Sequence, residues 1–168
     1  MAVAFALIPQ PAQSRNGHYG GRYFVRTDAD FRTREVRVEY VDGRRLHVLV
    51  DDKRLWHDVI GQGPLSGLAG CLDVDIGITP ATNTLPIKRL KLREQESRNI
   101  AVAYVPLPDQ VEAEFLPRRA EQRYTCLAQD RLYRYEGLFR GFTAELEVDE
   151  VGLVLDYPET FRRLPSRA

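Results

Sequence analysis

Apolar and polar residues alternate along much of the chain with a period of two. Val36 and Val38 alternate with charged residues, and Leu46 and Val48 repeat this pattern a few positions later. Such alternation predicts strands with one face in a core and the other in solvent. We therefore expect a mainly β fold.

The turn between these two strands decides which side chains share a face, because a slip of one residue turns every side chain over. A three-residue loop at 41–43 keeps the apolar sets together, with Gly43 in the left-handed conformation that such loops need. A second turn at Asp51-Asp52 would bring Leu55 and His57 onto the same face. The predicted pairs of the first hairpin are Val36 with Val48 and Val38 with Leu46.

Short strands of the same kind continue to the end of the chain, and no segment holds a helical period for more than two turns. Many short strands joined by turns predict an antiparallel, strongly curved sheet or an incomplete β-barrel with a few short helices. Residues 1–21 are rich in Pro and Gly and read as an irregular lead-in, so 22–168 form a single β-barrel-like domain. The further strands are expected at 72–76, 87–92, 100–105, 111–115, 124–128, 132–136, 142–149 and 151–156, and short helices at 65–68 and 159–162.

Two segments of the chain resemble each other. Residues 71–90 and 145–164 align without gaps and share five identical residues. Either an internal duplication or chance similarity between two β segments explains this. If the repeat is real, it makes Arg89 the partner of Asp75 and marks the carboxylates as architecture, since a catalytic pair needs to occur only once.

Composition narrows the choice of partners. The 168 residues carry 24 basic and 24 acidic side chains, so no net charge draws the chain to nucleic acid or an anionic membrane. The apolar run at 2–8 is too short to span a bilayer and no basic residue precedes it, so we expect no stable membrane insertion and a cytoplasmic location. Cys71 and Cys126 stand apart without metal-binding spacing, which fits a reducing compartment.

Two groups of polar residues are candidates for chemistry. Asp73 and Asp75 stand two apart on a predicted strand, a spacing that suits paired carboxylates in a hydrolase, a site for a divalent ion, or a face that is solvated or paired with Arg. The Thr82-Asn83-Thr84 segment offers hydroxyl and amide groups either to a ligand or to its own loop. The histidines are predicted to face apart, so we expect neither a metal nor a cofactor.

Several motifs resemble the bacterial family described as "Putative glycolipid-binding". The resemblance runs from about residue 23 to 163, and the Thr-Asn-Thr-Leu-Pro-Ile block is its most specific part. It implies an incomplete β-barrel like that of lipoprotein carriers, with an apolar cavity for a glycolipid or acyl ligand and no established catalytic residues. The segments that carry it are 23–28, 34–38, 71–76, 79–80, 82–90, 122–125, 133–135 and 152–158.

The chain departs from this family pattern at two places. The family's first strand carries a Trp, whereas Trp56 is the single Trp here, which questions how the barrel closes at that edge. Ala81 stands where a larger residue is expected, which would enlarge the cavity.

The favoured hypothesis is a non-enzymatic protein that binds a lipid or glycolipid. Acyl chains would lie on Val36, Val38, Leu46 and Val48, the polar end would meet Thr82, Asn83, Thr84 and Arg89, and Tyr135 and Tyr157 would form the rim. The alternatives are a hydrolase that uses Asp73 and Asp75 on a sugar or lipid ester, and a scaffold with a filled core. The scaffold hypothesis leaves room for a homodimer through an edge strand near residue 22.

Overall fold

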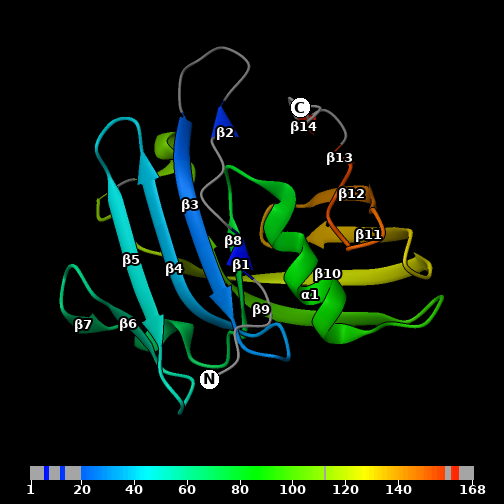
Figure 1. The fold of residues 1–168 in the computed structure, drawn as a ribbon, viewed down its shortest axis with the longest axis horizontal. Coiled ribbons are helices and arrows are strands. Elements are labelled where there is room, and N and C mark those ends of the chain that lie inside the picture. Colours follow the sequence, from blue (N-terminus) through cyan, green and yellow to red (C-terminus); the bar gives the residue numbers. More distant parts are fainter. Residues whose placement is uncertain (1–5, 8–11, 14–19, 112, 158–159, 163–168) are drawn as a thin grey trace.

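The chain forms two main sheets whose strands cross at a steep angle (Figure 1). The structure, a computed structural model, describes residues 6–7, 12–13, 20–111, 113–157 and 160–162. One sheet curls strongly into a half-barrel, and the described residues contain a single short α-helix. The prediction of a mainly β, strongly curved fold is confirmed.

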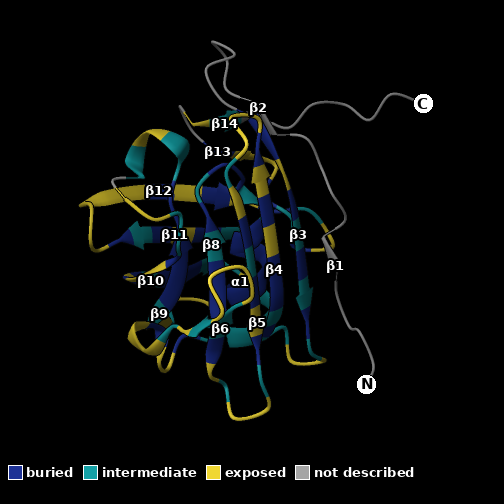
Figure 2. Cartoon of the chain, turned by 90° about the vertical axis from the view of Figure 1, so that its left-hand side faces the viewer, coloured by how far each residue is buried: buried dark blue, intermediate teal, exposed yellow. Residues whose placement is uncertain are grey.

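The first sheet is antiparallel and has the order β1-β3-β4-β5-β6-β7, with β2 also pairing with β3. Figure 2 shows the alternation of buried and exposed residues along β4 that the sequence pattern predicts. The edge of β3 near residue 22 is occupied, because β1 and β2 both pair with that strand. The strands are β1 (Ala6–Leu7), β2 (Ala12–Gln13), β3 (Gly20–Thr27), β4 (Thr33–Tyr40), β5 (Arg45–Val50), β6 (Trp56–Asp58) and β7 (Gly63–Pro64).

The second sheet has the order β12-β11-β10-β9-β8, and a small hairpin of β13 and β14 lies beside it. All its pairs are antiparallel except β8 with β9. The strands are β8 (Asp73–Ile76), β9 (Ser97–Val105), β10 (Arg118–Ala128), β11 (Leu132–Gly137), β12 (Phe142–Glu147), β13 (Asp156–Tyr157) and β14 (Phe161–Arg162).

The predicted first hairpin is confirmed, and the second is not. Val36 faces Val48, Val38 faces Leu46, and Gly43 has a φ of 90°. The next turn is longer than Asp51-Asp52, because Arg54 takes the left-handed conformation that closes it. The buried side chain of β6 is therefore Trp56, while Leu55 is exposed.

This register also corrects the placement of the histidines. His57 pairs with Leu49, so it lies on the same outer face as His47 instead of the apolar one. Each binds its own carboxylate: His47 Nε2 lies 3.0 Å from Glu35, and His57 Nε2 lies 3.1 Å from Asp51.

The strand predicted at 87–92 is wrong, because this segment belongs to α1 (Thr84–Leu90). The helical segment begins earlier, at η2 (Pro80–Asn83), where the Thr79 hydroxyl accepts a hydrogen bond from the Ala81 N–H and Pro80 occupies the first position. Thr-Pro is a start signal for a helix.

The apolar spacing in α1 resembles a strand because the helix is buried on two sides. Figure 1 shows α1 between the two sheets. Leu85 packs with the core of the first sheet, and Ile87 packs with the core of the second. A helix that touches two cores shows no single apolar stripe.

Three further predicted elements are absent, shorter or of another type in the structure. The described residues of 111–115 form no strand; Phe115 instead packs on the core from a loop after η3 (Pro108–Gln110). The strand expected at 151–156 is reduced to a bridge from Val148 to Val154 and to β13. Phe161 and Arg162 form β14 instead of a helix, whereas the helix predicted at 65–68 is present as η1 (Ser66–Leu68).

An ion pair anchors α1 to the second sheet. Arg89 donates from Nε and from one terminal nitrogen to the two carboxylate oxygens of Asp73, at 3.0 and 2.5 Å. Asp73 is fully buried, and its partner is largely buried. A buried carboxylate that loses its partner is costly, so this pair fixes where the helix lies.

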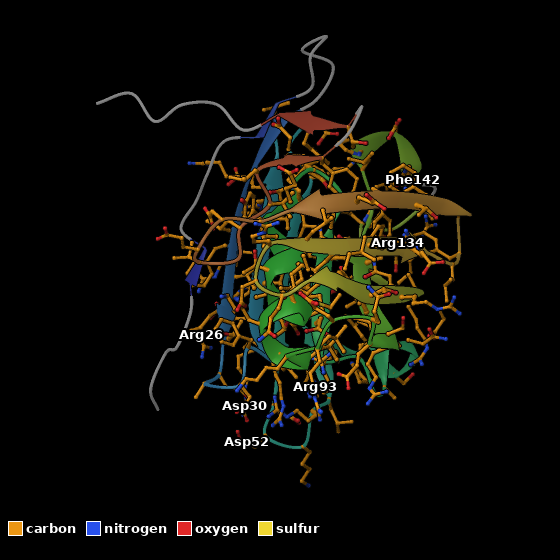
Figure 3. The ribbon with its side chains drawn as sticks, turned by 90° about the vertical axis from the view of Figure 1, so that its right-hand side faces the viewer. Arg26, Asp30, Asp52, Arg93, Arg134 and Phe142 are labelled. Atoms are coloured by element: carbon orange, nitrogen blue, oxygen red, sulfur yellow. The ribbon has the colours of Figure 1, made fainter. Side chains whose placement is uncertain are left out.

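Replacing Arg89 with Met should lower the free energy of unfolding by about 3–5 kcal/mol, because the Asp73 charge would stay buried without a partner. Urea denaturation measures this change. Arg134→Met is the matched control, since Arg134 pairs with Glu145 on the exposed face of the second sheet (Figure 3). That variant should lose at most about 1 kcal/mol. Equal effects of the two substitutions would contradict an anchoring role for the buried pair.

Candidate functional site

A pocket of about 330 Å³ opens where the end of β8 and η2 meet the second sheet and the β13–β14 hairpin. Aromatic residues from five strands and one turn make up six of its sixteen lining residues. The rings are those of Tyr104, Tyr135, Phe139, Phe142, Tyr157 and Phe161.

Three of these rings cluster around that of Tyr157, whereas Tyr104 and Phe139 pair with each other. Phe142 stacks on Tyr157 with their ring centroids 5.8 Å apart and an angle of 14° between the planes. Tyr135 and Phe161 meet the Tyr157 ring at 6.3 and 6.0 Å. Phe142, which Figure 3 places at the start of β12, remains 39% exposed and so forms part of the pocket's rim.

Two glycines make room for tyrosine hydroxyls in this wall. A Cβ atom on Gly77 would come within 2.9 Å of the Tyr104 hydroxyl, and one on Gly137 within 3.1 Å of the Tyr135 hydroxyl. A larger residue at either position would press against the tyrosine hydroxyl, so the close fit of these rings uses both glycines.

The polar floor of the pocket centres on Asp75. Gln122 Nε2 donates to the Asp75 carboxylate at 2.6 Å and lies 3.1 Å from the Tyr135 hydroxyl. The Thr82 hydroxyl also hydrogen-bonds to Asp75. Tyr124 closes the floor by donating to Asn83 Oδ1 at 2.6 Å.

Arg140 stands at the rim, in the turn between β11 and β12. Its guanidinium donates to the Tyr104 hydroxyl at 2.6 Å and to Gln110 Oε1 at 2.7 Å. The same group lies over two aromatic rings, 4.5 Å from the centroid of Tyr104 and 4.8 Å from that of Phe139. These contacts hold Arg140 at the mouth of the pocket.

Burial has a large effect on the titration of the floor. Desolvation raises the pKa of Asp75 to about 6, although Gln122 and Arg140 act in the opposite direction. Desolvation also raises the pKa of Tyr135 and Tyr157 above its ordinary value. Near neutral pH the pocket therefore contains neutral tyrosine hydroxyls around one ionised carboxylate.

The structure places the predicted polar and aromatic site residues in different surroundings. Asn83, Tyr135 and Tyr157 line the pocket. The Thr82 hydroxyl accepts from the Ile76 N–H and also bonds to Asp75, and the Thr84 hydroxyl donates to the Gly152 carbonyl. Arg89 is engaged by Asp73.

The four apolar residues predicted to hold acyl chains lie in the main core. Val36, Val38, Leu46 and Val48 are at most 3% exposed and belong to one packed cluster with the second sheet. Val38 and Leu46 also belong to the residues that line a more open hollow of about 660 Å³ on these strands, together with Arg22, Phe24, Arg45 and Ile60.

Asp73 and Asp75 have different surroundings. Arg89 pairs with Asp73 and not with Asp75, which corrects the partner that the sequence repeat implied. The repeat's counterpart of Asp73, Glu147, is exposed. With Asp73 enclosed by its own ion pair, the two carboxylates do not share an open cleft, which a hydrolase would require.

Gln122 and Arg140 are site residues that the sequence patterns did not single out. Gln122 occupies a buried position on β10 that alternation assigns to an apolar residue. The sequence feature that could have revealed Arg140 is the turn Phe139-Arg140-Gly141-Phe142, which has two aromatic residues where polar ones are usual.

No group of three or more His, Cys, Asp and Glu side chains in the described ranges is arranged to hold a metal ion. In the same ranges, no helix has the length and apolar character to cross a membrane. Both cysteines are buried and free.

Asp75→Asn should stabilise the protein at pH 7.5 by about 1–3 kcal/mol. The folded state raises this pKa from 3.8 to about 6, so the carboxyl's contribution to stability falls as the pH rises through this window and stays low above it. The amide removes the buried charge and keeps an acceptor for Gln122. Thermal unfolding at pH 4 and 7.5 measures the difference, with Glu114→Gln as an exposed control. An Asn variant that is less stable at pH 7.5 would contradict the buried, unpaired state of Asp75.

Comparison with known proteins identifies the family. Residues 10–163 match the family described as "Putative glycolipid-binding". A crystal structure of a DUF1089 family protein from Pseudomonas aeruginosa is similar, with a TM-score of 0.77 and 37% identity over 98% of this chain and 94% of that one. No curated protein matches the chain. The sequence resemblance is thereby confirmed, and the chain belongs to the "Putative glycolipid-binding" family.

Proposed function

We propose that the chain is a non-catalytic binding protein whose aromatic pocket holds the head group of a glycolipid or a similar lipid. The observation that carries this proposal is a concave site with six aromatic rings around a few converging polar groups. Sites of this composition are typical of small-molecule binding.

The pocket's size limits what enters it. Small-molecule pockets commonly measure roughly 300–1,000 Å³, and this one has about 330 Å³. It therefore accepts one ring-sized group, not a whole glycolipid. The rest of the ligand would lie over Phe139 and Phe142, which line the pocket and are partly exposed.

The lining suits an amphipathic head group. The apolar C–H face of a sugar ring packs on the free face of an aromatic ring, and Phe142, which stacks on Tyr157, is partly exposed at the pocket. Hydroxyl groups at the edge of the sugar would reach Asp75 and Asn83 at the floor. Rings and polar groups thus bind different parts of the same molecule.

The proposed ligand site is this pocket and not the site predicted from the sequence, which consisted of Val36, Val38, Leu46 and Val48. Those side chains fill the core between the sheets, and displacing them would open a cavity in a close-packed interior. The aromatic pocket is already open to solvent at its rim.

Phe142→Ala should weaken binding of octyl β-glucoside about five- to tenfold, because an aromatic contact of the pocket is lost. Isothermal titration calorimetry below the detergent's micelle concentration measures this. Phe142 is partly exposed, so the fold should survive its truncation.

Phe24→Ala is the matched control, since this Phe lines the more open hollow on the first sheet. It should leave the affinity unchanged. Loss of binding in Phe24→Ala but not in Phe142→Ala would move the site to that hollow. No binding by the unaltered protein would support a scaffold with a filled core.

A further inference from the structure

Asp75 differs from the other carboxylates that the fold buries. Glu35 is paired with Arg26 and Arg37, and Asp73 is paired with Arg89. Among the described residues, no Arg, Lys or His nitrogen lies within 4.0 Å of Asp75. Its hydrogen-bond partners are the neutral groups of Gln122 and Thr82, and the positive charge of Arg140 acts on it only from a greater distance.

From this geometry we propose that the group bound in the pocket is a cationic amine, and that Asp75 is its counter-ion. This inference rests on the proposed function and names the ligand class that the site takes. The amine could belong to an amino sugar or to the head group of an amine-bearing lipid.

A bound ligand that carried no positive charge would increase the free-energy cost of keeping the Asp75 carboxylate ionised. It would displace water from the pocket and so remove the remaining solvation of Asp75. A hydroxyl group could donate a hydrogen bond but would leave the charge unbalanced. A cationic amine supplies both a hydrogen-bond donor and the balancing charge, and buried charges in proteins are generally paired.

The wall of the pocket is also suited to a cation. Aromatic faces attract positive charge, and Arg140 already lies over Tyr104 and Phe139. The rings deeper in the pocket, Tyr135 and Tyr157, are part of the same lining.

Arg140 does not take the role of counter-ion itself. Tyr104 and Gln110 hold its guanidinium at the mouth, and it forms no ion pair with Asp75. Because Arg140 is exposed, solvent and salt screen its repulsion of an incoming amine. The other groups facing Asp75 are Gln122, Thr82 and tyrosines whose raised pKa keeps them neutral.

Calorimetry with three octyl probes tests this inference near pH 7: octyl β-glucoside, octyl 2-amino-2-deoxy-β-glucoside and octylamine. The amino glucoside should bind about tenfold or more tightly than the neutral glucoside, since a charge-assisted hydrogen bond replaces a neutral one. If octylamine binds as tightly as the amino glucoside, the amine of a lipid head group suffices. If it binds more weakly, the sugar ring is required as well.

Asp75→Asn separates the carboxylate's charge from its shape. The substitution should abolish the preference for the amino glucoside, so that the variant binds the two glucosides with similar affinity. The preference of the unaltered protein should also decline at pH 5, below the pKa of about 6.

Two results would overturn the inference in distinguishable ways. Neutral and amino glucosides that bind equally, both sensitive to Phe142→Ala, would reject the amine and keep the proposed function. Failure of every probe to bind would reject both.

Discussion

The buried pair of Asp73 and Arg89 determines how the rest of the molecule is arranged. It attaches α1 to β8, so that Leu85 reaches one core and Ile87 the other. The same attachment places η2, with Asn83 and Thr82, beside the end of β8. The floor of the pocket is therefore built on one ion pair whose charges would be costly to separate.

Neighbouring carboxylates on β8 thus have opposite physical roles. The charge of Asp73 is used in the ion pair that fixes α1, whereas Asp75 stays ionised in a desolvated pocket, which lowers the stability of the fold. Strained or unpaired charges of this kind concentrate at functional sites. The aromatic rings around Asp75 explain how the cost arises, because they exclude water without supplying a cation.

The sequence predicted what depends on local pattern. Alternation at Val36 and Val38 and the conformation of Gly43 defined the first hairpin correctly. Prediction from local pattern failed where tertiary contacts override that pattern. A helix that touches two cores, α1, replaces a predicted strand, and Arg54 makes the second turn longer than predicted. Asn83, Tyr135 and Tyr157 were predicted to meet a ligand and do line the pocket. Arg140 at the rim and Gln122, which bonds to Asp75, come from segments distant in sequence that no local spacing reveals.

The location of the ligand is the claim on which the functional account rests, and an NMR titration of the labelled protein with octyl β-glucoside tests it most directly. The account predicts that the largest amide shift changes occur at Gly77, Gly137 and their neighbours, whose backbones line the aromatic pocket. Shift changes centred on Arg22 to Phe24 and Arg45 to His47, around the more open hollow on the first sheet, would contradict it.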